Sequence, residues 1–114
     1  MTRRMLYFAG PYTNPDPVEN THRVVKAALA TYEDMPEWVP FIPHLSLLAH
    51  IVVPRDCDYW YDLDIEQMRH CDAIVRLPGA STGADREMKL ATAMGLQLVP
   101  FESLPERAQR AWKP

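Results

Sequence analysis

The sequence predicts an α/β fold, a doubly wound parallel sheet of four or five strands with helices on both faces. Two observations support this prediction. Short apolar runs that stop at Gly or Pro are typical of buried parallel strands. Segments with helical periodicity and one apolar face lie between these runs. Strands that alternate with helices imply right-handed crossovers in one parallel sheet, and 114 residues suit a single domain over 1–114.

The expected elements follow in order along the chain. Strands are predicted at residues 5–9, 38–42, 72–77 and 96–101. Helices are predicted at 58–71, 82–94 and 103–112, and another begins after Asn14 or Asp16, either of which can act as its cap. The apolar face predicted for this first helix consists of Val18, His22, Val25, Leu29 and Tyr32. Gly95 is the expected stop of the 82–94 helix, whereas 45–53 fits either a short buried helix or an irregular cover.

Composition excludes several classes of function. A net charge of −3 argues against a nucleic-acid polymer or an anionic membrane as the main partner. The sequence has no apolar run of about 18 residues that could span a bilayer, and its first apolar stretch is shorter than a signal-peptide core. A cytoplasmic protein is therefore expected. Cys57 and Cys71 fit no metal or redox spacing, and no disulfide between them is expected in a reducing compartment.

In open parallel sheets, ligands bind beyond the carboxyl ends of the strands. The loop 10–14, the loop 78–83 and the end of the second strand should meet there. Gly10, Tyr12 and Asn14 suit a base or a sugar, although Asn14 can instead cap the following helix. His44 follows the second strand and is either a cleft residue or a structural histidine. Trp60 either stacks on a base or belongs to the core.

Two acids lie on faces that should be apolar. Asp64 is four residues from both Trp60 and Met68, and Glu87 lies among Ala84, Leu90, Ala91 and Met94 at helical spacing. Burying an unpaired carboxylate is costly. Two acids in one cleft can hold different protonation states, which glycosidic-bond cleavage requires. The alternative is that each acid reaches solvent at an edge or pairs with Arg69, Arg76 or Arg86.

The loop 77–84 follows a strand and opens a helix. Its small residues, including Gly79 and Gly83, let backbone N–H groups approach a ligand, and a helix N-terminus favours an anion. Ser81 and Thr82 add hydroxyl donors. The alternative is ordinary capping by Ser81 or Thr82, with Asp85 completing a capping box. No spacing of His, Cys and carboxylate residues predicts a metal site.

Three segments together resemble the nucleoside 2-deoxyribosyltransferase-like superfamily, which includes a nucleotide N-hydrolase branch and small uncharacterised phage and bacterial proteins. They are residues 6–12, Asp64 eight positions before Asp72, and residues 81–87. The resemblance implies a three-layer, Rossmann-like (flavodoxin-type) fold without metal or cofactor. It further implies that Glu87 attacks the anomeric carbon, that Asp64 assists the leaving base, that the Tyr7 hydroxyl contacts the nucleophile and that Tyr12 contacts the ligand.

One position distinguishes the branches of this superfamily. Six residues before the nucleophile, enzymes that take free nucleosides carry an aspartate, whereas nucleotide hydrolases carry a serine that helps to hold the 5′-phosphate. Ser81 stands there, which favours a nucleoside monophosphate. The chain departs from the pattern at Asp85, Arg86 and Met88-Lys89. The resemblance also implies a homodimer or larger homo-oligomer, since a neighbouring subunit often completes the site.

The predicted function is therefore hydrolysis or base transfer at the N-glycosidic bond of a nucleoside or nucleoside 5′-monophosphate. The predicted catalytic residues are Glu87, Asp64 and Tyr7. The predicted substrate-binding residues are Gly10, Tyr12, Asn14, His44, Trp60, Gly79, Ser81 and Gly83. One alternative is a catalytically silent nucleotide-binding module, in which Arg86 or Lys89 disables Glu87 through a salt bridge. Another is a protein that acts through protein contacts and uses the two acids structurally.

Overall fold

A four-stranded, all-parallel sheet forms the centre of the molecule in the computed structural model, which describes residues 2–113. The strands are β1 (Arg4–Ala9), β2 (Trp38–Phe41), β3 (Ala73–Arg76) and β4 (Gln97–Val99), in the order β2-β1-β3-β4. Tyr7 is the register partner of Phe41 on one side and of Ile74 on the other. The parallel sheet and its four strands are confirmed, and no strand end differs from its predicted position by more than two residues.

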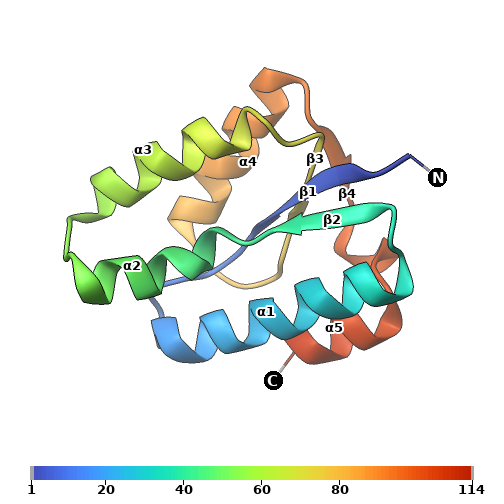
Figure 1. Cartoon of the computed structure of the whole chain (residues 1–114), viewed down its shortest axis with the longest axis horizontal. Coiled ribbons are helices and arrows are strands. Elements are labelled where there is room, and N and C mark those ends of the chain that lie inside the picture. Colours follow the sequence, from blue (N-terminus) through green and yellow to red (C-terminus); the bar gives the residue numbers. More distant parts are fainter. Residues whose placement is uncertain (1, 114) are drawn as a thin grey trace.

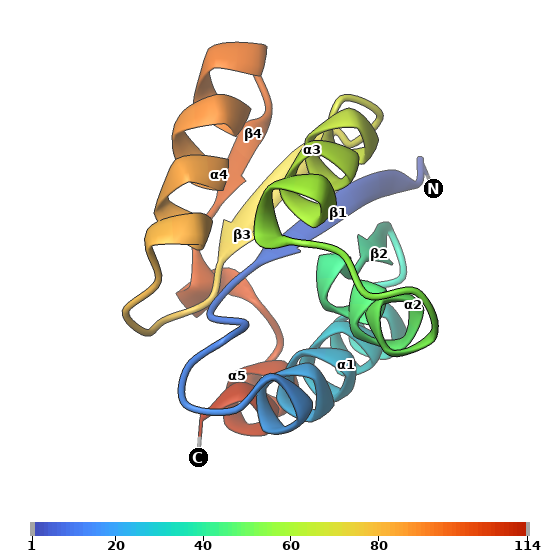
Figure 2. The same ribbon diagram turned by 90° about the vertical axis from the view of Figure 1, so that its left-hand side faces the viewer.

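Helices cover both faces of the sheet, so the three-layer, Rossmann-like prediction is confirmed (Figures 1 and 2). One face carries α1 (Pro17–Asp34) and α5 (Glu106–Trp112), and the other carries α3 (Cys57–Met68) and α4 (Thr82–Met94). After β2, a 3-10 turn (Pro43–Leu45) leads into α2 (Ser46–Val52), which lies near α3 beyond the carboxyl end of β1. A second 3-10 turn (Phe101–Ser103) follows β4.

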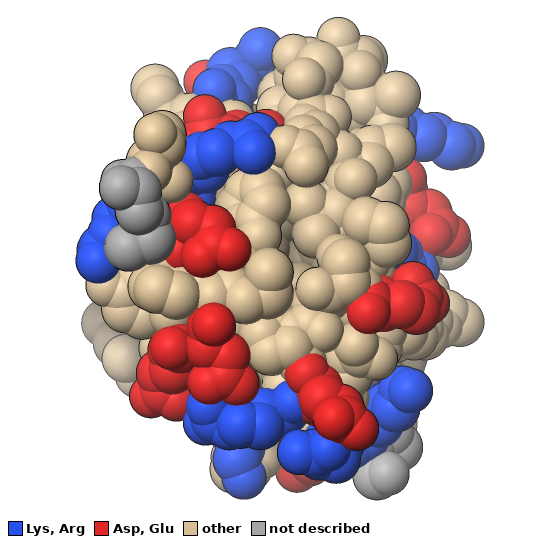
Figure 3. Space-filling model, turned by 90° about the vertical axis from the view of Figure 1, so that its right-hand side faces the viewer, with Lys and Arg blue, Asp and Glu red and all other residues tan. Residues whose placement is uncertain are grey.

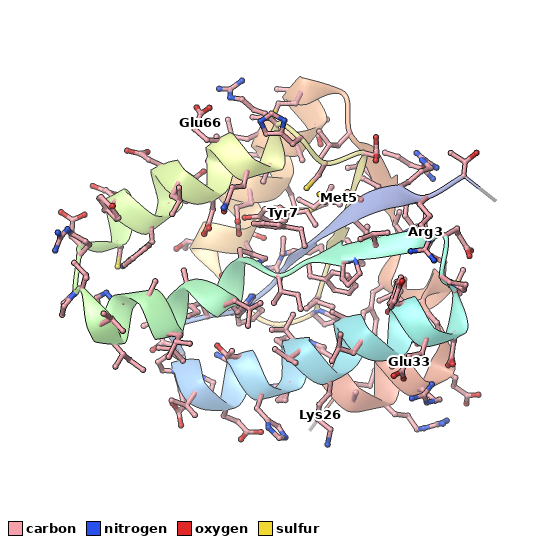
Figure 4. The ribbon with its side chains drawn as sticks, in the orientation of Figure 1. Arg3, Met5, Tyr7, Lys26, Glu33 and Glu66 are labelled. Atoms are coloured by element: carbon pink, nitrogen blue, oxygen red, sulfur yellow. The ribbon has the colours of Figure 1, made fainter. Side chains whose placement is uncertain are left out.

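Alternation along the strands divides the core into two halves. Leu6 and Phe8 of β1 pack in the cluster that contains α1 and α5, whereas Tyr7 and Ala9 pack in the cluster with α3 and α4. This is the period of two that a pleated strand imposes on a sheet covered on both faces. Figure 4 shows Tyr7 pointing from β1 into the molecule, while Lys26, Glu33 and Glu66 point outward from their helices.

The predicted apolar face of α1 is wrong. Val18 is 63% and Leu29 is 48% exposed, and His22 is also exposed. The side chains that α1 buries are instead small or polar: Asn20, Val24, Ala27, Ala28, Ala30 and Thr31. The Asn20 side-chain amide donates to the carbonyl oxygens of Tyr12 and Asn14, at 3.0 and 2.9 Å. A satisfied polar group can be buried at little cost, and the alanines allow a close approach to the sheet.

Two further features bear on partners. On the face at the amino ends of the strands, acidic and basic side chains surround a largely uncharged centre, and neither sign forms a continuous patch (Figure 3). None of the helices within residues 2–113 is long and apolar enough to cross a membrane.

Candidate active site

A cavity of about 420 Å³ opens at the carboxyl ends of the strands. Its walls come from the loop after β1, the turn before α2, the first half of α3 and the first turns of α4. This volume lies within the range of small-molecule sites. The predicted site residues that line it are Gly10, Tyr12, Asn14, His44, Trp60, Asp64, Ser81, Gly83 and Glu87. The structure therefore brings most of the predicted site together at the sheet edge where it was expected.

Gly79 does not line the cavity but supports its wall. Its φ of +127° is one that other residues rarely adopt, and a Cβ atom there would lie 2.8 Å from Pro11 Cγ. A Cβ atom at Gly10 would lie 3.0 Å from Leu77 Cβ. Glycine at these two positions lets the loops after β1 and β3 lie against each other. The geometry thus gives Gly79 a backbone role, in place of the predicted substrate contact.

Glu87 extends from α4 into the cavity and is only 8% exposed. Burial raises the pKa of its carboxyl group to about 7, although a hydrogen bond from Tyr7 and the charge of Arg76 oppose the rise. The Tyr7 hydroxyl donates to Oε2 of Glu87. Tyr7 itself is fully buried behind the cavity wall, and its ring stacks on Phe41 with centroids 5.4 Å apart. Tyr7 therefore holds the carboxylate in place and favours its ionised form.

Asp64 enters the same cavity from α3. Burial, followed by the negative charge of Glu87, raises the pKa of Asp64 to about 8. Because Tyr7 hydrogen-bonds to Glu87, Glu87 is the acid that ionises first. Near neutral pH the pair then consists of an ionised Glu87 and a protonated Asp64, the division of roles that two-carboxyl catalysis uses.

Neither acid is paired with a guanidinium group. Within residues 2–113, the ion pairs include Arg69 with Glu66 at 3.3 Å and Arg76 with Asp85 at 3.0 Å, but none involves Asp64 or Glu87. Arg86 lies over the ring of Tyr61, with Cζ 4.0 Å from the ring centroid. The interpretation of the two acids as members of buried ion pairs is therefore wrong.

Ser81 caps α4 and also faces the cavity. Its Oγ accepts a hydrogen bond from the backbone N–H of Ala84 at 3.1 Å. A hydroxyl that accepts in this way keeps its own hydrogen for a ligand, so capping and ligand binding are compatible. A Cβ atom at Gly83 would meet nothing closer than Ser81 Oγ at 4.0 Å. Packing therefore does not explain why glycine occupies that position in the first turn.

On the opposite wall, His44 is 3% exposed, and its Nε2 lies 2.9 Å from the carbonyl oxygen of Pro11. Because a carbonyl only accepts, we assign the hydrogen to Nε2, which leaves Nδ1 as an acceptor. Burial lowers the pKa of His44 and keeps the ring neutral. The Tyr12 ring meets His44 edge-on at 5.8 Å. Asp16, and not Asn14, caps α1, so Asn14 remains a cavity residue.

Trp60 is half-buried at the rim, where its Nε1–H donates to Nδ1 of His50 at 2.8 Å. Sequence reasoning missed Tyr61 as a cavity residue, and it considered Arg86 as an ion-pair partner of the acids but not as a residue that lines the cavity. The signal for Tyr61 was present, because three residues before Asp64 is the same face of a helix. No group of three or more His, Cys, Asp or Glu side chains in the described chain could hold a metal ion.

Comparison with known proteins finds similarity among solved structures and not among family models or curated sequences. No protein-family model and no curated protein matches the sequence. Among solved structures, the chain is similar to a 2-deoxyribosyltransferase from Leishmania mexicana, with 28% sequence identity and a TM-score of 0.58. The match covers 86% of this chain and 63% of that enzyme, so the chain spans less than two thirds of its structural relative. The protein has a nucleoside 2-deoxyribosyltransferase-like fold, as its motifs predict.

Proposed function

We propose that the protein is an enzyme that cleaves the N-glycosidic bond of a nucleoside or nucleoside 5′-monophosphate, by hydrolysis or by base transfer. The observation that carries the proposal is the pair of carboxyl groups in one cavity, from the buried Glu87 and the half-buried Asp64, neither of which is in an ion pair. The hydrogen bond from Tyr7 distinguishes the two acids. Similarity to a solved deoxyribosyltransferase supports the same reaction class.

The two acids divide the chemistry. Ionised Glu87 attacks the anomeric carbon, and a glycosyl ester forms as the carbon–nitrogen bond breaks. Protonated Asp64 gives its hydrogen to the departing nitrogen, so the base leaves neutral. Water or an incoming base then attacks the anomeric carbon, Asp64 takes up its proton, and Glu87 is released as the carboxylate. Hydrolysis and base transfer differ only in this second nucleophile.

Ser81 supports a 5′-monophosphate as the substrate. Its free hydroxyl hydrogen faces the cavity at the N-terminus of α4, where backbone amides favour an anion. Ser81→Asp tests this assignment without removing the cap, because Asp is as good an N-cap as Ser. The variant should keep its stability, lose at least tenfold in kcat/KM for monophosphates and retain activity on free nucleosides. Equal activity on both substrate classes before and after substitution would refute the phosphate assignment.

The reaction itself is tested by product analysis. Purified protein is incubated with purine and pyrimidine nucleosides and their monophosphates, of both the ribo and deoxy series, with and without an acceptor base. Chromatography should detect free base or an exchanged nucleoside, and Glu87→Ala should abolish either product. No base release and no exchange across the whole panel would refute the proposal.

The structure weakens the alternative of a catalytically silent binding module. That alternative depended on a salt bridge from Arg86 or Lys89 to Glu87. Arg86 instead lies on the ring of Tyr61, and Lys89 is exposed on α4. With Glu87 held only by Tyr7 among the hydrogen bonds of the described residues, the carboxylate remains available to react.

A homo-oligomer and a cytoplasmic location remain part of the proposal. Exposed apolar side chains on α2 support the oligomer: Leu48 is 70%, Ile51 65% and Val52 73% exposed. Apolar surface of this kind is often covered by a partner. Light scattering should give a mass above that of one chain, and Ile51→Lys should reduce it. A monomeric wild-type protein would refute the assembly.

A further inference from the structure

Within residues 2–113, three side-chain polar atoms are buried and have no hydrogen-bond partner: Thr21 Oγ1, His44 Nδ1 and Tyr61 Oη. Such atoms are rare in folded proteins because each forfeits its hydrogen bonds to water, and one in a native structure calls for an explanation. Two of the three belong to residues that line the cavity, His44 and Tyr61. Their grouping there indicates that a ligand supplies the missing partners.

Tyr61 is the member of this pair with no structural task for its polar atom. The other ring nitrogen of His44 tethers the loop after β1 through Pro11, which by itself accounts for a histidine at that position. The Tyr61 hydroxyl makes no hydrogen bond in the described chain, and a phenylalanine would pack equally well under Arg86. Arg86 lies beside Tyr61 but can only donate, so the hydroxyl hydrogen has no acceptor among the described residues, and an acceptor on a ligand would supply one.

The surroundings make this hydroxyl a donor. Burial raises the pKa of Tyr61, so the oxygen keeps its proton at physiological pH, although the Arg86 guanidinium opposes that rise through its charge and as a neighbouring N–H donor. A cation over an aromatic face draws electron density from the ring, which strengthens the O–H donor and weakens the oxygen as an acceptor. The matching atom of a ligand is therefore a hydrogen-bond acceptor.

The position of Tyr61 on α3 indicates which part of the ligand its hydroxyl contacts. Tyr61 precedes Asp64 by three residues on α3, so the two side chains lie on one helix face and both line the cavity. Asp64 is the proposed proton donor to the leaving base, whereas Ser81 lies on the other helix. The acceptor nearest Tyr61 then belongs to the base. Arg86 lies against the ring, and its exposed side chain can turn aside as the base enters.

We infer that Tyr61 is a substrate-binding residue whose hydroxyl donates to a ring nitrogen or carbonyl oxygen of the leaving base, beside Asp64. This inference rests on the proposed function and adds a specificity determinant to it. Holding the base by an acceptor next to its glycosidic nitrogen orients that nitrogen toward the Asp64 proton. Bases without an acceptor adjacent to the glycosidic nitrogen are then poor substrates.

Tyr61→Phe removes only the unpartnered hydroxyl and keeps the ring beneath Arg86. The matched control is Tyr59→Phe on the same helix, since Tyr59 is 51% exposed and is not among the cavity residues. Binding of deoxynucleosides and their monophosphates should weaken about 3- to 10-fold in Tyr61→Phe, the usual effect of one neutral hydrogen bond. Binding of the base-free sugars 2-deoxyribose and 2-deoxyribose 5-phosphate should not change.

The results separate this inference from the proposed function. Base release by the wild type together with unchanged binding in Tyr61→Phe would overturn the inference alone. Equal weakening for base-free sugars would place the contact on the sugar and overturn the assignment to the base. A fall in thermal stability of Tyr61→Phe would show a structural role for the hydroxyl instead. A wild type that neither binds nor cleaves any nucleoside or nucleotide would overturn both proposals.

Discussion

Glu87→Gln should stabilise the folded protein, and the gain should increase with pH. Its carboxyl group has a pKa of about 7 in the folded state, against 4.5 for an unburied glutamate. Between these values the folded state binds the proton more tightly than the unfolded state, so stability falls as pH rises. Gln cannot ionise, and its amide oxygen can still accept the hydrogen bond from Tyr7. The variant therefore removes the charge while keeping the contact.

The magnitude follows from the pKa difference. At about 1.4 kcal/mol for each pH unit, the gain in unfolding free energy should be about 1 kcal/mol at pH 5 and about 3 kcal/mol at pH 8. Urea unfolding followed by far-ultraviolet circular dichroism at pH 5, 6, 7 and 8 measures it. A matched control is Glu66→Gln, because Glu66 forms an exposed surface pair with Arg69. That variant should change stability by less than about 1 kcal/mol.

A gain that does not grow between pH 5 and pH 8 would refute the reasoning. It would mean that Glu87 is ionised in the folded state already at pH 5, through a favourable partner that offsets burial. A loss of stability at pH 8 would lead to the same conclusion. Either result would also contradict the raised pKa of Glu87, on which the acidic limb of the pH profile depends.

Three further predictions concern the same site. If Glu87 must be ionised and Asp64 protonated, kcat/KM should rise as pH approaches about 7 and fall above about 8, whereas a flat profile from pH 5 to 9 would contradict the assigned roles. Tyr7→Phe removes a hydrogen bond that lowers the pKa of Glu87, so the acidic limb of that profile should move to higher pH; an unmoved limb would argue against the contact. Gly79→Ala should lower the unfolding free energy by about 1–3 kcal/mol because of its positive φ and the close Pro11 ring. Gly83→Ala is the control for Gly79→Ala, and it should change stability by no more than about 1 kcal/mol, in the stabilising direction.

Much of the fold was predictable because its signals are local. Each strand is a short apolar run and each long helix repeats with a helical period, so the elements and the parallel sheet follow from the sequence. Gly95 ends α4 with a φ of +83°, as predicted, and Ser81 caps its N-terminus, as one of the two interpretations of that loop proposed. Because ligands bind beyond the carboxyl ends of parallel strands, the strand ends predict where the site lies. The predicted helix faces then place Asp64 and Glu87 in that site.

The face of α1 was not predictable from periodicity. Asn20 and Thr31 are polar and lie outside the predicted apolar face, yet both are buried because their polar atoms find partners. The partners of Asn20 are carbonyl groups of the loop that leads into α1, and the direction in which those groups point is set by the folded chain. Gly79 was not predictable as a backbone residue either, since its neighbour Pro11 is distant in the sequence and near in space.

The sequence by itself determined which residue types could reach the end of the sheet, because strand order, helix phase and loop position are properties of short segments. Tertiary structure alone decided how those residues behave there. Whether Glu87 is paired, how far its pKa rises and which hydroxyl lacks a partner depend on burial and on charges from β1, β3, α3 and α4 together. Burial and electrostatic effects add up over all neighbours in space, so they cannot be worked out from any single segment of the chain.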